Sequence, residues 1–178
     1  MKKSVLLLFF AGCVATGIFG IGRKIPMNRV NDLGQREGYW RDSLGEGITH
    51  ELYYKGGKKD GLFKCFIRNE LFLFGEYTAD NMSGTWYMFG DEGELRCTID
   101  SIELNKDSIY TGYPCCRIFR KYKCYCTDYY PGGGVEKEGY MVCDEEFEIE
   151  IWEIGEWKYY DESGNLIKTK DYGDRRTP

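Results

Sequence analysis

The sequence predicts an all-β protein, a repeat array of β-hairpins that forms a single-layer, twisted antiparallel meander. Three observations support this prediction. A glycine followed two residues later by an aromatic residue returns with a period of about 23, apolar and polar residues alternate on either side of Gly/Asp-rich turns, and helical spacing of apolar residues is nearly absent. Alternation with a period of two across short turns is typical of β-hairpins.

The recurring glycine defines the period. Gly38, Gly61 and Gly84 are spaced 23 residues apart, and the pattern returns at Gly155, close to three periods later. A fixed period of this length indicates units that each form one supersecondary element and bury an apolar stripe by stacking. We expect each glycine to lie where the chain needs a positive φ or where backbone crowds backbone.

An aromatic residue stands two positions after each of these glycines. The four residues are Trp40, Phe63, Trp86 and Trp157. Because a strand alternates its side chains between two faces, we expect these rings on the buried face, stacked on the aromatic residue of the neighbouring hairpin. They are therefore assigned to the core and not to a binding surface.

The repeat domain is expected over residues 31–173, with a short tail at 174–178. Hairpins can be placed directly over 61–77, 84–99 and 155–172, where alternating runs flank turn residues. The pattern blurs over 100–152. This stretch is expected to hold degenerate repeats with longer loops or, as the alternative, an inserted subdomain.

The N-terminus has the pattern of an export signal. Two lysines precede an apolar run, and the stretch FAGC, which ends at Cys13, resembles the lipobox of bacterial lipoproteins. The resemblance implies a signal peptide over 1–12, a lipid on Cys13, a tether over 13–30, and a place in the cell envelope at the outer membrane or cell surface. The alternative is a single transmembrane anchor, because Val5 to Gly22 is long enough to approach a bilayer span.

The repeated stretches resemble a known family. GQREGYW, GGKKDGLF, DNMSGTWYMFGDEGEL and GEWKYYDESGNL are similar to the MORN-repeat variant of bacterial proteins named YwqK-family antitoxins of toxin–antitoxin systems. The resemblance covers residues 31–99 and 153–173 and implies the single-layer β-meander. Together with an export signal, the family name implies an antitoxin-like immunity protein that blocks a toxin outside the cytoplasm.

The cysteines are clustered. The chain has eight, and five of them lie between residues 115 and 143. In an exported chain such density predicts at least one disulfide, with unbonded buried cysteines as the alternative. No metal site is expected, because CC followed by CYC lacks the paired C-x-x-C spacing of a zinc site. The disulfide candidates are Cys115, Cys116, Cys124, Cys126 and Cys143.

No residue pattern predicts catalysis or a cofactor. His50 is the only histidine and lies in an expected strand without a nucleophile motif. A run of carboxylates could hold calcium or a glycosidase pair, but its alternation favours a solvated strand face that protects a sheet edge. The carboxylates are Asp144, Glu145, Glu146, Glu148 and Glu150.

The remaining composition bears on partners. The net charge of −5 argues against nucleic acid, and 15 Tyr and 10 Phe provide both core and surface rings. Tyr129, Tyr130 and Tyr140, around a glycine-rich loop, are the candidates for exposed contacts. We therefore expect a non-enzymatic, lipid-anchored protein that binds another macromolecule, an unidentified protein, through its sheet face. A glycan- or cell-wall-binding lipoprotein, a hydrolase with paired carboxylates and the immunity protein are the alternatives.

Overall fold

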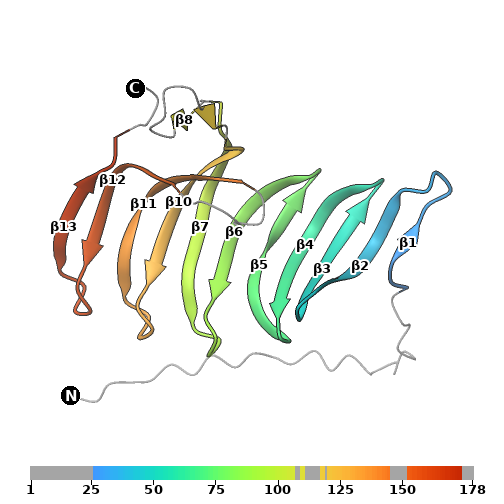
Figure 1. The fold of residues 1–178 in the computed structure, drawn as a ribbon, viewed down its shortest axis with the longest axis horizontal. Coiled ribbons are helices and arrows are strands. Elements are labelled where there is room, and N and C mark those ends of the chain that lie inside the picture. The colour runs from blue at the N-terminus through green and yellow to red at the C-terminus, as the bar shows by residue number, and fades with distance from the viewer. Residues whose placement is uncertain (1–25, 107–108, 111–116, 119, 145–151, 174–178) are drawn as a thin grey trace, which may run out of the picture.

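The computed structural model describes residues 26–106, 109–110, 117–118, 120–144 and 152–173. This part of the chain contains strands and no helix. Eleven strands form one open antiparallel sheet, and each pairs with its neighbour in sequence except where β7 is followed by β10 (Figure 1). The predicted fold class, an array of consecutive hairpins in one layer, is confirmed.

The main sheet runs without a break from the N-terminal to the C-terminal strand. Its strands are β1 (Arg29–Val30), β2 (Arg36–Gly45), β3 (Ile48–Lys55), β4 (Lys58–Ile67), β5 (Glu70–Thr78), β6 (Asn81–Phe89), β7 (Leu95–Leu104), β10 (Tyr122–Tyr129), β11 (Val135–Cys143), β12 (Trp152–Tyr160) and β13 (Leu166–Asp171). A separate two-stranded sheet consists of β8 (Ile109–Tyr110) and β9 (Arg117–Ile118).

The described strands within 100–152 belong to both sheets. β10 and β11 continue the main sheet, and β8 and β9 form a small excursion between β7 and β10. Asn105 closes the neck of this excursion: its backbone N–H donates to the Lys121 carbonyl at 2.8 Å, and its side-chain amide donates to the Arg120 carbonyl at 3.0 Å. The next strand of the main sheet, β10, begins one residue after Lys121, at Tyr122.

Tight turns join the strands of the regular part. Arg68–Asn69 and Ala79–Asp80 have φ values of 53° and 70°, and of 49° and 68°. Positive φ at both central residues is the type I′ geometry, whose twist matches that of the strands it joins. Asn and Asp tolerate this region better than most residues, which explains their presence at the second position.

The 23-residue period is visible in hydrogen bonds between hairpin turns and the sheet. The Gly57 N–H donates to the Arg36 carbonyl at 3.0 Å, and the Asp80 N–H donates to the Lys59 carbonyl at 2.9 Å. Donors and acceptors in these two bonds are each displaced by 23 residues. The turn between β3 and β4 thus bonds to the beginning of β2, and the turn between β5 and β6 bonds to the beginning of β4. Successive units therefore repeat the same geometry.

The four recurring glycines have the positive φ that their position requires. The angles are 73° at Gly38, 119° at Gly61, 65° at Gly84 and 61° at Gly155. Strand pairing shifts register opposite Gly61, Gly84 and Gly155, so these glycines form β-bulges. A bulge with a left-handed glycine bends its strand and strengthens the local twist.

The core consists of large side chains on one face of the sheet. Trp86 and Trp157 are fully buried, and each covers a glycine of the adjacent strand. A Cβ atom at Gly75 would lie 2.1 Å from the Trp86 ring, and one at Gly139 would lie 2.5 Å from the Trp157 ring. The bare backbone of each glycine therefore makes the space for the indole above it.

The first repeat packs less tightly than the others. Trp40 is only half-buried, although Phe63, Trp86 and Trp157 are buried. Its ring meets Tyr54 edge-on at 5.9 Å and the Arg36 guanidinium at 4.4 Å. The difference follows from its place near the end of the array, where only the two-residue β1 lies beyond β2.

The sheet begins slightly earlier than the boundary expected at residue 31. Arg29 and Val30 pair with Glu37 and Arg36, inside the segment expected to be a tether. Over the described residues, no helix has the length and apolar character needed to cross a membrane. Cys13, the signal peptide over 1–12 and the tail at 174–178 lie outside the described residues.

Candidate functional site

Most core side chains lie on one face of the sheet; on the opposite face Thr127 and Val142 are also buried, while the aromatic and charged side chains are half-buried or exposed. Phe63, Trp86 and Trp157 point to the core side, so their chain neighbours point to the opposite side. We call this opposite side the open face. Its central row lies in register across seven strands and consists of Lys64, Phe74, Tyr87, Thr98, Thr127, Glu138 and Lys158.

Aromatic pairs lie at intervals along the open face. Ring centroids are 6.0 Å apart for Phe74 and Tyr87, and 5.1 Å apart for Tyr125 and Tyr140. Both distances fall in the range of favourable aromatic pairs. Tyr140 is 44% exposed although it stacks on Tyr125, so the pair holds a ring in place while leaving it accessible.

A third aromatic pair lies near the N-terminal end of the open face. Tyr39 and Tyr53 have ring centroids 5.5 Å apart, and Tyr53 is 39% exposed. Partial burial and a hydrogen bond to Glu51 raise the pKa of Tyr39 to about 12. The open face therefore carries tyrosines at both ends of the array.

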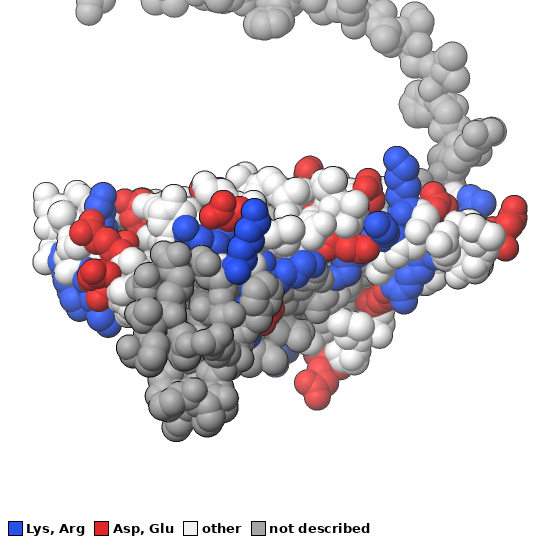
Figure 2. Space-filling model, turned by 90° about the horizontal axis from the view of Figure 1, so that it is seen from above, with Lys and Arg blue, Asp and Glu red and all other residues white. Residues whose placement is uncertain are grey.

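Charges of both signs accompany these rings. The guanidinium of Arg41 lies 3.8 Å from the Glu51 carboxylate, and the Tyr160 hydroxyl donates to Glu138 at 2.7 Å. Partial burial and the carboxylate of Glu138 raise the pKa of Tyr125 to about 12. Seen from above, Lys and Arg also lie among Asp and Glu over the described surface (Figure 2).

The three tyrosines expected around the glycine loop do not form one cluster. The hydroxyl groups of Tyr129 and Thr98 are 3.1 Å apart, and the Tyr130 hydroxyl donates to the Tyr160 carbonyl at 2.8 Å. Tyr140 lies opposite Tyr125, four residues and so about 13 Å along β10 from Tyr129. Tyr140 is the most exposed of the three and belongs to the open face.

Cysteines gather on the core side of β7, β10 and β11. The sulfur atoms of Cys97 and Cys126 are 3.3 Å apart, and those of Cys124 and Cys143 are 3.6 Å apart. No disulfide joins any of the cysteines in the described ranges. Mutual hydrogen bonding and burial raise the pKa of the Cys97 and Cys124 thiols, so both are protonated at neutral pH.

The predicted disulfide stays a prediction. Among the candidate cysteines that the structure describes, Cys124 and Cys143 are the pair whose sulfur atoms lie close together. Cys115 and Cys116 lie outside the described residues. Sequence reasoning missed Cys97, which is 29 residues from Cys126 and reaches it only because β7 pairs with β10. The alternation of Cys124 and Cys126 on one face was the available signal that a partner should lie on a neighbouring strand.

The other candidate residues have structural contacts. His50 lies on the core side of β3, with its ring edge-on to Phe63 at 5.1 Å. Asp144 forms an ion pair with Arg120 at 2.6 Å and accepts the Lys121 N–H at 3.0 Å, so it stabilises the neck of the excursion. The other four candidate carboxylates lie outside the described residues: Glu145, Glu146, Glu148 and Glu150.

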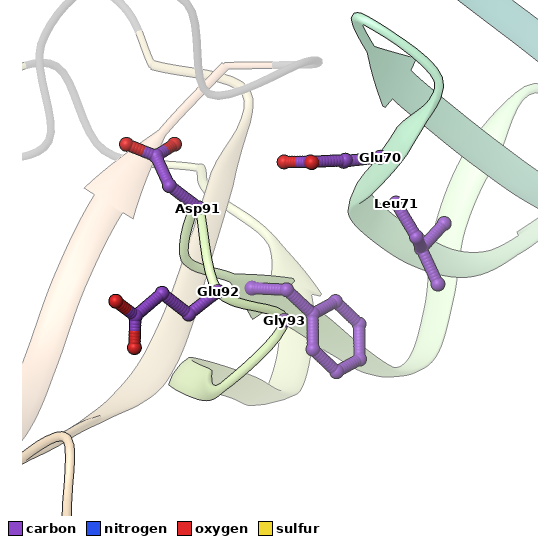
Figure 3. A pocket seen from close by; sticks show the side chains of 6 residues that line it. Glu70, Leu71, Asp91, Glu92 and Gly93 are labelled. Atoms are coloured by element: carbon purple, nitrogen blue, oxygen red, sulfur yellow. The ribbon is translucent and has the colours of Figure 1, made fainter.

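A shallow acidic hollow of about 520 Å³ lies between the β4–β5 and β6–β7 turns. Glu70 extends from β5 toward the turn that carries Asp91 and Glu92 (Figure 3). All three carboxylates are exposed. Catalytic carboxylates usually lie in a site that excludes water, whereas these three face solvent. The hollow therefore gives no support to the hydrolase alternative.

The fold and the open face define a class of protein, an open array of β-hairpins with aromatic and charged side chains on its free face. No family model, curated protein or solved structure matches the chain. The function of the chain is therefore inferred from the residues of the open face.

Proposed function

We propose that the chain is a non-enzymatic, lipid-anchored, MORN-like repeat protein that binds another protein through its open face. The observation that carries the proposal is the series of half-exposed aromatic residues along this face, from Tyr53 through Tyr87 to Tyr140. Protein interfaces are enriched in tyrosine, phenylalanine and arginine at their centre and are surrounded by polar residues. The open face carries aromatic residues of this kind, Phe74, Tyr87 and Tyr140, and polar or charged residues flank them in its central row.

The geometry of the face also suits a large partner. Adjacent strands are about 4.8 Å apart, so the seven strands of its central row extend over roughly 30 Å. Standard protein–protein interfaces bury about 800 Å² on each partner, which a face of this width can supply. Because the rings are held by cross-strand pairs, little side-chain freedom is lost when a partner covers them.

Two alternatives use the same surface. Sugar rings could stack on Tyr140 and Tyr53, which are the most exposed tyrosines of the open face. An antitoxin-like immunity protein would use the whole face against a toxin outside the cytoplasm. In each case the lipid on Cys13 would hold the protein at a membrane, where acyl chains contribute about 0.8 kcal/mol per buried CH₂.

Site-directed photo-cross-linking in the native envelope tests the proposal. A cross-linking amino acid at Tyr53, Tyr87 or Tyr140 should give the same discrete protein adduct. The matched control is Glu92, which is exposed on a hairpin tip away from the open face. Equal labelling from Glu92, or adducts at all four positions that differ from one another, would contradict specific binding by the open face.

Two further measurements separate the alternatives. If the protein forms no discrete protein adduct but co-sediments with purified cell wall, the result would favour the glycan-binding hypothesis. Fatty-acid labelling of the wild type and of Cys13→Ser tests the anchor on its own, because only the cysteine can be acylated at this position. A labelled wild type and an unlabelled variant support the anchor, and a wild type without label that retains Met1 supports the transmembrane alternative.

A further inference from the structure

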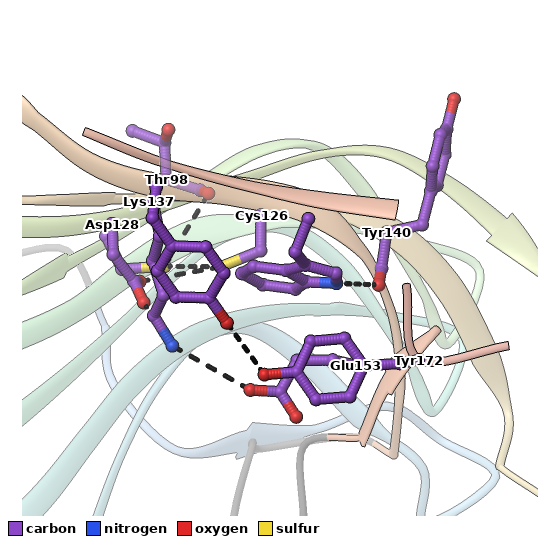
Figure 4. A network of polar contacts seen from close by, with 10 residues as sticks. Thr98, Cys126, Asp128, Lys137, Tyr140, Glu153 and Tyr172 are labelled. Atoms are coloured by element: carbon purple, nitrogen blue, oxygen red, sulfur yellow. Dashed lines mark hydrogen bonds and ion pairs between the residues drawn. The ribbon is translucent and has the colours of Figure 1, made fainter. Parts of the chain in front are cut away.

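Three potential metal-binding atoms converge on the core side of the sheet where β7 meets β10. Cys97 and Cys126 place their sulfur atoms 3.3 Å apart, and the Cys126 sulfur lies 3.5 Å from Oδ1 of Asp128. All three atoms lie within 4.8 Å of one another. Figure 4 shows Cys126 and Asp128 directed toward the same point. Both cysteines are buried, and Asp128 is half-buried.

Strand register explains the convergence. Asp128 pairs directly with Cys97, and Cys126 pairs with Ile99, so both residues of β10 point to the same side as Cys97. The cross-strand pairing places the third donor next to the two from β10. No local spacing motif announces such a site, which is why sequence analysis gave no reason to expect a metal.

We propose that Cys97, Cys126 and Asp128 bind one Zn²⁺ ion. Tetrahedral zinc has Zn–S distances of about 2.3 Å and Zn–O distances of about 2.0–2.2 Å, which places two sulfur ligands roughly 3.8 Å apart and a sulfur and an oxygen roughly 3.6 Å apart. The observed 3.3 Å and 3.5 Å separations need only a small outward movement of the side chains. A water molecule would complete the tetrahedron.

Charge balance favours a divalent ion. The Asp128 carboxylate already has a counter-charge in Lys137, whose ammonium lies 3.2 Å from Oδ2. Metal coordination deprotonates thiols, so Zn²⁺ replaces two protons and leaves the net charge of the buried cluster unchanged. Cu⁺ would release the same two protons and add only one charge, and a carboxylate is a poor ligand for it.

Lys137 also positions the ligand. It holds Oδ2 of Asp128, which leaves Oδ1 directed at Cys126 (Figure 4). Its ammonium is held in turn by Glu153 at 3.8 Å and by the face of Trp157 at 5.1 Å. Partners that orient a metal ligand in this way are a regular part of metal sites.

A second stretch of the sheet shows that the fold does not itself demand this cluster. Four strands earlier, the row across β3 to β6 contains His50, Cys65, Leu73 and Met88. The equivalent row across β7 to β12 contains Cys97, Asp128, Lys137 and Tyr159. The exchange of apolar residues for a carboxylate and an ammonium on the core side is unfavourable unless these groups have partners there.

The test is metal binding by the purified, fully reduced chain. We expect one Zn²⁺ to bind in competition with a chromophoric chelator, with about two protons released per ion as thiol coordination requires. Co²⁺ in place of Zn²⁺ should give thiolate-to-metal charge-transfer bands. Reduced, folded protein that retains no Zn²⁺, or that binds Co²⁺ without these bands, would overturn the proposal.

Variants assign the ligands. Cys97→Ser and Asp128→Asn should weaken zinc binding by more than the roughly 10–100-fold that follows loss of an outer-shell partner. Asp128→Asn keeps the shape of a half-exposed side chain, so it tests the site even if Cys97→Ser fails to fold. The matched control is Cys143→Ala, which removes a buried thiol of the neighbouring pair and should leave the affinity unchanged. Undiminished binding by Asp128→Asn, or loss confined to Cys143→Ala, would contradict the assignment.

Discussion

The two halves of the sheet use the same backbone plan with different side chains. One core row reads Leu52, Phe63, Gly75 and Trp86 across β3 to β6, and the next four strands repeat it as Ile99, Cys126, Gly139 and Trp157. An aliphatic residue, a glycine and a tryptophan occur at equivalent places. The position of Phe63 is filled by Cys126.

This comparison separates what the fold needs from what it permits. Both halves keep a tryptophan above a bare glycine, because the indole occupies the space that a Cβ atom would fill. The Phe63 position is less constrained: a large ring fills it in one half, and a small thiol fills it in the other. The second half gains a cluster of sulfur atoms at the cost of aromatic packing.

The largest expected effect is the loss of a buried tryptophan. Trp86→Ala should lower the free energy of unfolding by about 3–5 kcal/mol, the usual range for emptying a buried aromatic site. Trp157→Ala should cost less within this range, because Trp86 contacts the Phe63 and Tyr77 rings and Trp157 has Cys126 in place of the equivalent phenylalanine. Urea unfolding of both variants measures the difference. Trp86→Ala or Trp157→Ala that removes an iodide-quenchable part of the wild-type fluorescence would contradict the burial on which both values depend.

The next effect tests the glycine beneath each indole. Gly75→Ala and Gly139→Ala should each destabilise the fold by about 1–3 kcal/mol, the usual cost of overpacking, because the new methyl group would meet a tryptophan ring. Gly132→Ala is the matched control, since its φ is ordinary and no atom lies within 4 Å of the added Cβ. Equal stability of all three variants would show that the indoles can move aside.

A smaller effect is expected where only the backbone resists substitution. Gly84 has φ of 65° with nothing within 4 Å of an added Cβ, so Gly84→Val should cost about 1–2 kcal/mol for the left-handed conformation alone. Gly84→Asn should recover much of this, since asparagine tolerates the region better. Thermal unfolding compares the two variants, and equal losses would point to a cause other than φ.

The smallest effect is a pH dependence of the open face. The pKa of Tyr39 is raised from 10.0 to about 12, first by burial and then by its hydrogen bond to Glu51. The folded state therefore keeps a proton that the unfolded state loses, so stability is full below pH 10 and falls as the pH rises toward 12. Tyr39→Phe should make this alkaline fall in the unfolding temperature shallower. An unchanged slope would show that Tyr39 does not contribute to it.

Much of the fold was accessible from the sequence because its signals are local. A left-handed glycine, an aromatic residue two positions later and alternation along each strand are all readable within one hairpin. The period placed Gly61 and Gly84 in equivalent environments before any strand pairing was known. The close contacts of Gly75 and Gly139 could not be predicted, because each glycine lies beneath an indole of the adjacent strand and only the strand register reveals that contact.

The candidate site was less accessible for the same reason. Cys97 is separated from Cys126 by the excursion that contains β8 and β9, which interrupts the period and hides the pairing of β7 with β10. The open face is likewise a property of rows that cross strands, so single-strand patterns could not assemble Phe74, Tyr87 and Glu138 into one surface. Tyr140 was identified as a contact residue, but its partner Tyr125 was not.

The hydrogen bonds from Gly57 to Arg36 and from Asp80 to Lys59 also bear on how such a chain can change length. Because each unit repeats the same link to the strand two positions earlier, a duplication or deletion of 23 residues joins equivalent backbone positions and preserves the alternation of faces. A gain or loss of one unit changes the sheet by two strands, or about 10 Å in width. Duplication or deletion of a unit can therefore adjust the width of the array in steps of this size.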